Sequence, residues 1–403
     1  EVSLRRARMA RPYDVVVFGS TGFTGTLICE YLAQKEGLKW AVSGRNEQKL
    51  SALVAKLSAA GAKSAPAPLV CSIDDKESLH RVVGSARVLI SAAGPFAKVG
   101  TPVVEACVAV GTDYCDITGE VAWVRSMVDR FGAEAEAKGV LLCSCCGYDS
   151  IPSDLGTFYG IGKLREAFGP ATRVGFVGNY GVSRGAPSGG TLASGINMEK
   201  DPELARQMQD PFLLGGRPAN GPRAVDADFV GAEFDPKIGS WIAPFGMAGI
   251  NTRVVRKSAG LLGYGPAFAY REVSIAPNEE VAKKMARVGP PAAKREEMVK
   301  AGRLPGPGEG PSAEVRAKSF FRMHIRVEAE DSPERAVFVK VSGGDPGYTE
   351  TAKMVSEAAL CLAHQRAVLP VRGGFHTPAS AMGSSLIERL VANSITFEQT
   401  EAP

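Results

Sequence analysis

The sequence predicts an α/β protein: an N-terminal Rossmann domain with a doubly wound parallel sheet, then a second α/β domain with a largely antiparallel sheet. The first observation is residues 14–32, which have the pattern of a buried strand, a glycine-rich turn and a helix. The second is the alternation of apolar strands with helices up to about residue 150, which is typical of a parallel sheet. From residue 172 onward, strands of alternating polarity predict an antiparallel sheet with one covered face.

The glycine-rich turn follows a run of apolar residues, 15–18, that predicts a strand buried on both faces. Gly19, Gly22 and Gly25 stand at GxxGxxG spacing before a helix. A strand–turn–helix of this kind directs backbone N–H groups and the positive end of a helix dipole toward a pyrophosphate. The alternative is a glycine-rich turn that binds nothing. The expected cofactor-binding residues here are Gly19, Ser20, Thr21, Gly22, Phe23, Thr24 and Gly25.

The second strand, 39–43, ends at Gly44-Arg45-Asn46. An NAD site would place an acidic residue here to bind the ribose 2′-hydroxyl, and this chain has Arg45 instead. A planar cation matches the 2′-phosphate of NADP, so we expect Arg45 and Asn46 to bind NADP. The alternative is an exposed loop arginine before a helix that begins at Asn46.

Strands are further predicted at 68–71, 87–92, 113–116 and 139–144, with helices at 101–110 and 121–137. Asp74, after the third strand, either accepts a hydrogen bond from adenine or caps the next helix. Ala93, Gly94 and Pro95 follow the fourth strand, which lies beside the first where the strand order reverses. Small residues there suit a nicotinamide running along the backbone, although a plain turn would also explain them.

The second half begins with strands predicted at 173–180, 268–275, 318–328 and 335–341. Ser188 precedes a helix and is read first as its N-cap, with a substrate contact as the alternative. Residues 200–240 are rich in Pro, Gly and Asp and predict a long surface loop. Arg253, Arg256 and Lys257 are read as a solvated strand face, or as a surface that meets a phosphopantetheine or acyl carrier.

The chain is expected to return to the first domain near its end. An amphipathic helix is predicted at 350–364, one more helix at 377–389 and a short strand at 394–398. The expected division is therefore a tail at 1–12, a Rossmann domain at 13–170 with 346–403 packed on it, and a substrate-side domain at 171–345. The cofactor cleft would lie between the domains.

Composition places the chain among globular enzymes. It has 403 residues, 45% hydrophobic and 22% charged, with a net charge of +4 that gives no argument for nucleic acid. No apolar run is long enough to span a membrane. The eight cysteines lie mostly in apolar patterns, which favours reduced thiols in a reducing compartment, cytoplasmic or organellar. Cys143, Cys145 and Cys146 have no histidine nearby, so a strand is preferred over a metal site.

The arginine-rich stretch 1–11 is read either as the remnant of a plastid or mitochondrial transit peptide or as sequence upstream of a start at Met9. It is left out of the fold prediction.

With these motifs in place, the chain resembles the saccharopine dehydrogenase-like oxidoreductases, most closely their trans-acting enoyl reductase branch. The resemblance extends over about residues 13–397 and rests on short stretches in family order. They are Val-Val-Phe-Gly-Ser-Thr-Gly-Phe-Thr-Gly, Ser-Gly-Arg (43–45), Ala-Gly-Pro-Phe (93–96), Asp-Ile-Thr-Gly-Glu (116–120), Cys-Gly-Tyr-Asp-Ser-Ile-Pro-Ser-Asp (146–154), Ser-Gly-Gly-Thr (188–191), Gly-Pro-Ser (310–312), Gly-Asp-Pro-Gly-Tyr (344–348) and Thr-Pro-Ala-Ser-Ala-Met-Gly (377–383).

The resemblance implies NADP as cofactor and a role in lipid or glycolipid metabolism, with some members linked to lipid droplets. It implies an acyl or lipid substrate, possibly carrier-bound, and permits a homodimer or peripheral membrane association. Two departures stand out. Phe96 and Val99 replace tyrosines that relatives usually carry, and residues 278–311 are charged where some relatives have an apolar insert.

An enoyl reductase needs a hydrogen-bond or proton donor for the substrate oxygen that gains charge. The candidates at the predicted cleft are Tyr148, Asp149, Ser150 and Tyr348. Each has a structural alternative: a core aromatic for Tyr148, caps of a helix starting near Ser153 for Asp149 and Ser150, and packing under the returning helix for Tyr348. Two other functions remain open: a cofactor-binding but catalytically silent subunit, and an amino-acid dehydrogenase of the saccharopine type.

Overall fold

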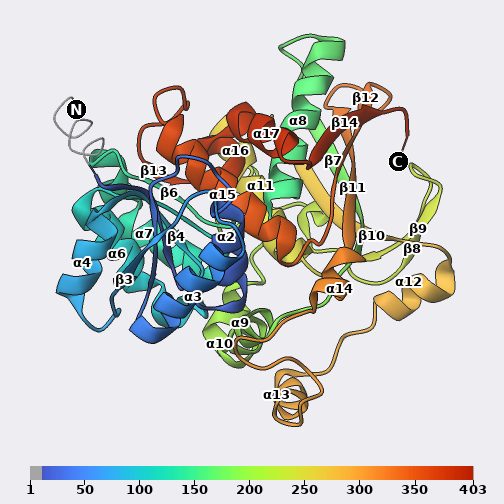
Figure 1. Cartoon of the computed structure of the whole chain (residues 1–403). Helices are drawn as coiled ribbons and strands as arrows, with labels where there is room; N and C mark the ends of the chain where they lie inside the picture. The colour runs from blue at the N-terminus through green and yellow to red at the C-terminus, as the bar shows by residue number, and fades with distance from the viewer. Residues whose placement is uncertain (1–10, 403) are drawn as a thin grey trace.

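The computed structural model describes residues 11–402, which form two seven-stranded sheets. The first sheet has the order β13-β6-β5-β4-β1-β2-β3 and the second the order β14-β12-β11-β7-β10-β9-β8. Figure 1 shows the first sheet and its helices in blue and cyan on one side of the molecule. The second sheet lies on the other side, with α15 and α16 between them.

Every strand of the first sheet is parallel to its neighbours, and the strand order reverses between β1 and β4. The predicted Rossmann architecture is therefore confirmed. Its strands are β1 (Tyr13–Phe18), β2 (Trp40–Gly44), β3 (Ala67–Val70), β4 (Ala86–Ser91), β5 (Asp113–Asp116) and β6 (Leu141–Cys143). Its helices are α2 (Phe23–Leu32), α3 (Glu47–Ala59), α4 (Lys76–Gly84), α5 (Phe96–Val99), α6 (Thr101–Val110) and α7 (Val121–Ala137).

The second sheet is antiparallel except for the pair β7 and β10. Helix α8 (Ile151–Phe168) covers one face of it. Gly156 permits the close approach, since a Cβ there would lie 2.5 Å from Cδ1 of Ile325. The strands are β7 (Val174–Arg184), β8 (Glu233–Asp235), β9 (Ser240–Pro244), β10 (Ala269–Ala276), β11 (Phe320–Ala329), β12 (Ala336–Gly343) and β14 (Thr396–Thr400). The helices inserted among them are α9 (Gly189–Lys200), α10 (Pro202–Gln207), α11 (Ala248–Leu262), α12 (Glu279–Met285), α13 (Ala292–Lys300) and α14 (Ala313–Ala317).

The C-terminal segment contributes to both sheets. Helix α15 (Thr349–His364) packs on β1, β4, β5 and α2 of the first domain. Strand β13 (Gly374–His376) adds a seventh strand to the first sheet, whereas β14 pairs with β12 in the second. The helix expected at 377–389 is two helices, α16 (Pro378–Ala381) and α17 (Gly383–Ala392), since the chain turns at Gly383, whose φ is +45°.

Two predictions for the second half need correction. The stretch 200–240 is mostly a surface loop, as predicted, but it also contains α10, β8 and a 3₁₀ turn at Ala224–Asp226. Arg253, Arg256 and Lys257 are not solvated and not on a strand, because they lie on α11 and are buried. They offer no surface to a carrier.

The two buried arginines have a structural role. The Arg256 guanidinium donates at 3.0 Å both to the carbonyl of Pro211 and to that of Tyr270. Arg253 donates to the carbonyl of Met208 at 2.6 Å and pairs with Asp228. The bonds to Met208 and Pro211 satisfy carbonyls of a segment that lies outside the helices and strands.

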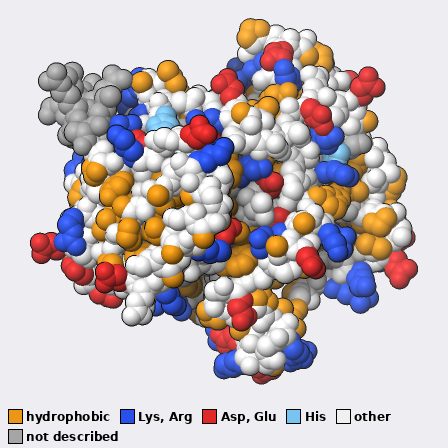
Figure 2. Space-filling view, viewed as in Figure 1, with side chains coloured by type: hydrophobic (Ala, Val, Ile, Leu, Met, Phe, Trp, Pro, Cys, Tyr) orange, Lys and Arg blue, Asp and Glu red, His pale blue; other side chains and the backbone are white. Residues whose placement is uncertain are grey.

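All eight cysteines are buried free thiols. Within residues 11–402 no three metal-ligating side chains gather as a metal site would require. In the same residues, no helix combines the length and apolarity needed to cross a membrane. Acidic and basic side chains are interspersed over the described part of the face in Figure 2.

Residues 1–10 of the arginine-rich stretch lie outside the described residues. The structure therefore does not bear on either interpretation of this stretch. Arg11 is described. Its guanidinium donates at 2.6 Å to the carbonyls of Ala86 and Val110 and to the hydroxyl of Thr112.

Candidate functional site

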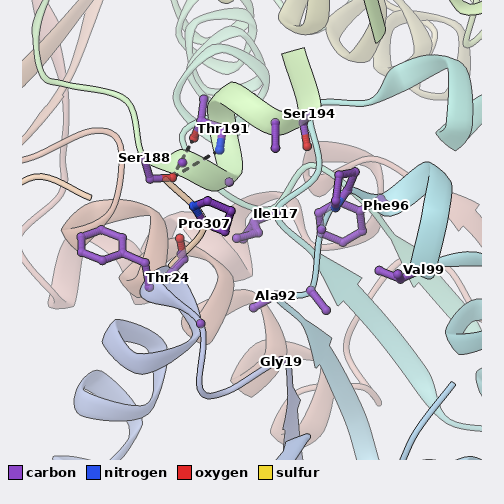
Figure 3. A pocket seen from close by; sticks show the side chains of 18 of the residues that line it. Gly19, Thr24, Ala92, Phe96, Val99, Ile117, Ser188, Thr191, Ser194 and Pro307 are labelled. Atoms are coloured by element: carbon purple, nitrogen blue, oxygen red, sulfur yellow. Dashed lines mark hydrogen bonds between the residues drawn. The ribbon is translucent and has the colours of Figure 1, made fainter. Parts of the chain in front are cut away.

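A cavity of about 740 Å³ lies at the carboxyl ends of β1 and β4, where the order of the first sheet reverses. Open α/β sheets bind their ligands at this position. The first domain supplies one wall, and α9 with residues 307–308 supplies the opposite wall. In Figure 3, Gly19 and Ala92 lie across the cavity from Ser188 and Thr191.

The glycine-rich turn forms the floor of the cavity. Gly19 has a φ of +79°, and a Cβ there would lie 2.8 Å from the amide nitrogen of Ala93. A Cβ at Gly25 would lie 2.2 Å from the carbonyl oxygen of Gly19, so only glycine lets α2 start this close to the turn. Within residues 11–402 no side chain caps α2, which leaves N–H groups of its first turn for an anionic ligand.

Only some of the residues predicted in this turn line the cavity. Thr21, Gly22, Phe23 and Thr24 line the cavity together with Gly19. Ser20 and Gly25 do not. The Ser20 side chain is buried and donates to the carbonyl of Ser43 at 3.1 Å, which ties the turn to β2.

Of the predicted residues after β2 and β3, two line the cavity and one caps a helix instead. Arg45 lines the cavity and is exposed, and among the described residues its guanidinium has no hydrogen-bond or ion-pair partner. Asn46 instead caps α3 by accepting from the Lys49 amide at 2.9 Å. Asp74 lines the cavity, and the cap of α4 is the neighbouring Asp75. The interpretation of Asp74 as a cap is therefore wrong.

Of the predicted catalytic side chains, Asp149 alone lines this cavity. The Asp149 side chain is half-buried beside Gly119. A Cβ placed on Gly119 would lie 3.2 Å from Oδ2 of Asp149 and 2.7 Å from Cδ1 of Ile250, so both side chains pack closely against this glycine. Burial raises the pKa of Asp149 from 3.8 to about 7. Among residues 11–402 the Asp149 carboxyl forms no hydrogen bond, so nothing there offsets the loss of water.

Tyr148 and Ser150 lie away from the cavity. The Tyr148 ring packs 5.2 Å from Phe321, centroid to centroid, and its hydroxyl is 3.9 Å from the sulfur of Met323. Ser150 donates to Oδ1 of Asn251 at 2.9 Å and does not cap α8. The core alternative for Tyr148 is therefore confirmed, and the cap alternative for Ser150 is wrong.

Tyr348 lies behind the wall of the cavity. Its ring meets Phe23 edge to face at 5.0 Å. Its hydroxyl accepts from the amide of Ser188 and lies 3.0 Å from Oγ1 of Thr191. Ser188 also caps α9, as predicted, and lines the cavity. Tyr348 therefore holds the start of α9 against the start of α2.

Beyond the glycine turn the lining is mostly apolar. Its large side chains are Phe96, Val99, Ile117, Leu192, Met198, Met247 and Ile250. Residues on α9, including Ser194, and on α11 were not predicted as site residues, and neither was Glu120. No local pattern marks them, because they come from segments far apart in the chain. The motif Asp-Ile-Thr-Gly-Glu carried the one available signal, for Glu120.

Comparison with known proteins agrees with this geometry. The sequence profile of the saccharopine dehydrogenase NADP-binding domain matches residues 15–143. A Mycobacterium tuberculosis protein provisionally named trans-acting enoyl reductase is 33% identical, over 97% of this chain and 98% of its own. The chain belongs to the saccharopine dehydrogenase-like oxidoreductases. A Mycobacterium leprae relative named trans-acting enoyl reductase is 29% identical over the same shares.

Saccharopine dehydrogenase (L-Glu forming) from Saccharomyces cerevisiae has the same fold, with a TM-score of 0.56 and 11% identity over 96% of this chain and 100% of that one. As a member of this family, the protein is an NAD(P)-dependent oxidoreductase with NADP(H) as its cofactor. The cavity fits that cofactor: the turn has no room for side chains at Gly19 and Gly25, and Arg45 is free to meet a phosphate.

Proposed function

We propose that this member of the family reduces an enoyl or related double bond of an acyl or lipid substrate with NADPH. One observation carries the proposal. The wall of the cavity beyond the glycine turn is apolar and contains one half-buried acid, Asp149. An apolar slot suits an acyl chain, and an acid suits the oxygen of a thioester carbonyl. The names of the relatives point in the same direction.

The chain's own residues would act on the substrate oxygen. Bound NADPH would supply a hydride. Adding it to the β carbon of an enoyl thioester sends negative charge to the carbonyl oxygen, which must be stabilised by a donor. Asp149, with a pKa of about 7, is substantially protonated near neutral pH and can donate. The apolar side chains around it would exclude water from the developing charge.

The proposed roles of Tyr148, Ser150 and Tyr348 in proton donation lose support, because their hydroxyls do not line the cavity. The substitutions at Phe96 and Val99, both in the lining, support a second candidate, a subunit that binds cofactor without turnover. Asp149 favours the enzyme, since it supplies a donor that does not depend on the missing tyrosines.

An amino-acid dehydrogenase of the saccharopine type has less support. A substrate with several carboxylates needs several free cations in the cleft. Among the described lining residues, the cations are Arg45 and Arg295. Arg295 is already paired with Glu199.

The test is to incubate the purified protein with NADPH and trans-2-enoyl thioesters of coenzyme A with short, medium and long chains. NADPH oxidation is followed by absorbance, and the saturated product by mass spectrometry. We expect turnover that rises with chain length, since longer chains bury more apolar surface. Saccharopine with NADP⁺ is the comparison substrate. Turnover with saccharopine alone, or tight NADPH binding without any turnover, would contradict the proposal.

The same proposal includes four more specific features of the protein. It would act in glycolipid metabolism, take a carrier-bound acyl chain, form a homodimer and associate peripherally with membranes or lipid droplets. The burial of Arg253, Arg256 and Lys257 removes one basic surface on which a carrier could have docked.

A further inference from the structure

A buried carboxylate, Glu120, joins the two walls of the cavity. It follows Gly119 of the lining and is 1% exposed. On the first-domain side, its Oε1 accepts from the amide of Phe96 at 2.8 Å and its Oε2 accepts from the amide of Ala97 at 2.9 Å. These amides begin α5, the segment that carries Phe96 and Val99 into the cavity.

The opposite wall reaches the same carboxylate. Ser194, on α9, donates its hydroxyl to Oε1 of Glu120 at 2.7 Å. Figure 3 shows Ser194 beside Phe96 at one end of the cavity. Among the described residues, this is the one hydrogen bond between α9 and the first domain at 13–170.

The other polar contacts of α9 lie at its two ends. At its start, Ser188 and Thr191 bond to Tyr348, and the amide of Gly189 donates to the carbonyl of Glu309 at 3.0 Å. At its end, Glu199 accepts from the amide of Ala292 at 2.7 Å and Lys200 pairs with Glu296, so these contacts join α9 to α13 and not to the first domain. The middle of the helix, which forms the wall opposite Phe96, therefore depends on Glu120 for its polar anchorage.

We propose that Glu120 is a positioning residue for the cofactor's nicotinamide end. Its carboxylate fixes α5 to the middle of α9, whereas Tyr348 holds only the start of α9, so the spacing of the two walls beside Phe96 depends on Glu120. A carboxylate is required, because three donors converge on two oxygens. A glutamine would turn an NH₂ group toward at least one of these buried donors.

The decisive variant is Ser194→Ala, which removes the bond between the walls and leaves the first domain intact. Hydrogen–deuterium exchange is measured on peptides covering 189–200 with NADPH present. We expect exchange about ten-fold faster than in the wild type, because local opening loses a charge-assisted hydrogen bond. Ser194→Thr keeps the hydroxyl and should restore slow exchange. Asn197→Ala, on the same helix, is the matched control, since no hydrogen bond of its side chain is seen in residues 11–402.

A second readout follows the nicotinamide itself. Acrylamide should quench the fluorescence of bound NADPH several-fold more in Ser194→Ala than in wild type, because the loosened wall admits the quencher. The Kd for NADPH should change by less than about three-fold, since the glycine turn and Arg45 hold the rest of the cofactor.

Glu120→Gln should show both effects more strongly. Unchanged exchange and unchanged quenching in Ser194→Ala would overturn the proposal. So would loss of folding in Glu120→Gln alongside wild-type behaviour in Ser194→Ala, because Glu120 would then support only the first domain. Both readouts use NADPH alone, so their outcome is independent of whether the substrate is an enoyl thioester.

Discussion

The two walls of the cavity differ in how they are built. The first-domain wall comes from the ends of β1 to β5 and the turns that follow them, several of which are visible as short motifs: residues 19–24, 44–45, 71–74, 92–96 and 117–119. The opposite wall comes from α9 and the segment at 307–308, held through contacts with Tyr348, Glu309 and Glu120. We expect the first wall to bind the part of the cofactor that is common to many enzymes. The second wall is where specificity for a substrate can differ.

The largest effect expected from a single change tests the first wall. Gly22→Val should weaken NADPH binding by at least about 100-fold, because a branched side chain would occupy the space in front of the first turn of α2. The nearest described atom to a Cβ at Gly22 is the carbonyl oxygen of Gly19 at 3.4 Å, so stability should change little. Fluorescence titration and thermal melting measure the two quantities. Gly162→Ala is the matched control, since its Cβ would meet nothing within 4 Å. Unweakened NADPH binding would place the pyrophosphate elsewhere.

The proposed acid is tested by Asp149→Asn. Turnover of an enoyl thioester should fall by about 10²–10⁴-fold, the range typical of a lost general acid, while the Kd for NADPH stays unchanged. In the wild type, the rate should decrease as the pH rises through about 7, because the acid form is the active one. Asp129→Asn, in a surface pair with Arg125, is the control. A flat pH profile together with an active Asp149→Asn variant would show that the proton comes from another group.

The preference for NADP is tested at Arg45. Arg45→Asp should weaken NADP binding by about 10–100-fold, as expected for losing a charge-assisted contact with a phosphate. Binding of NAD should change far less, which makes NAD the internal control. Titration of both nucleotides by fluorescence gives the ratio. Equal losses would mean that Arg45 supports the loop and does not read the phosphate.

The smallest effect concerns stability. The pKa of Asp149 is raised in the folded protein, so its contribution to folding is most favourable below the unfolded pKa of about 4 and declines as the pH rises toward 7. Asp149→Asn should therefore match the wild type in Tm at pH 4 and exceed it modestly at pH 8. Thermal melts at the two pH values measure the difference. A variant less stable than wild type at pH 8 would mean that the carboxylate has a stabilising partner.

The two walls also differ in how well their structure could be predicted from the sequence. The Rossmann half was predictable because each strand, turn and helix there is local, and the bounds of α6, β5 and α7 matched the expected ranges. β13 was missed, because a strand of three residues, the first of them a glycine, shows no periodicity. The charge of Arg256 suggested solvent, but its guanidinium is paired with the carbonyls of Pro211 and Tyr270, and those partners are distant in sequence. In the site, Asp149 and Arg45 could be predicted as lining residues from their side-chain chemistry and their positions after strands. The contact of Tyr348 with α9 could not, because it depends on how distant segments pack.

The position of α15 has a consequence for how this protein is made. The helix covers strands β1, β4 and β5, and its Glu357 is fully buried, where it accepts from Tyr31 and Arg389 and forms an ion pair with Lys35. The first sheet therefore lacks part of its cover until the ribosome has synthesised residues 349–364 and released them from its tunnel. An isolated N-terminal fragment ending near residue 170 should accordingly be prone to aggregate, even though it contains the whole glycine-rich motif.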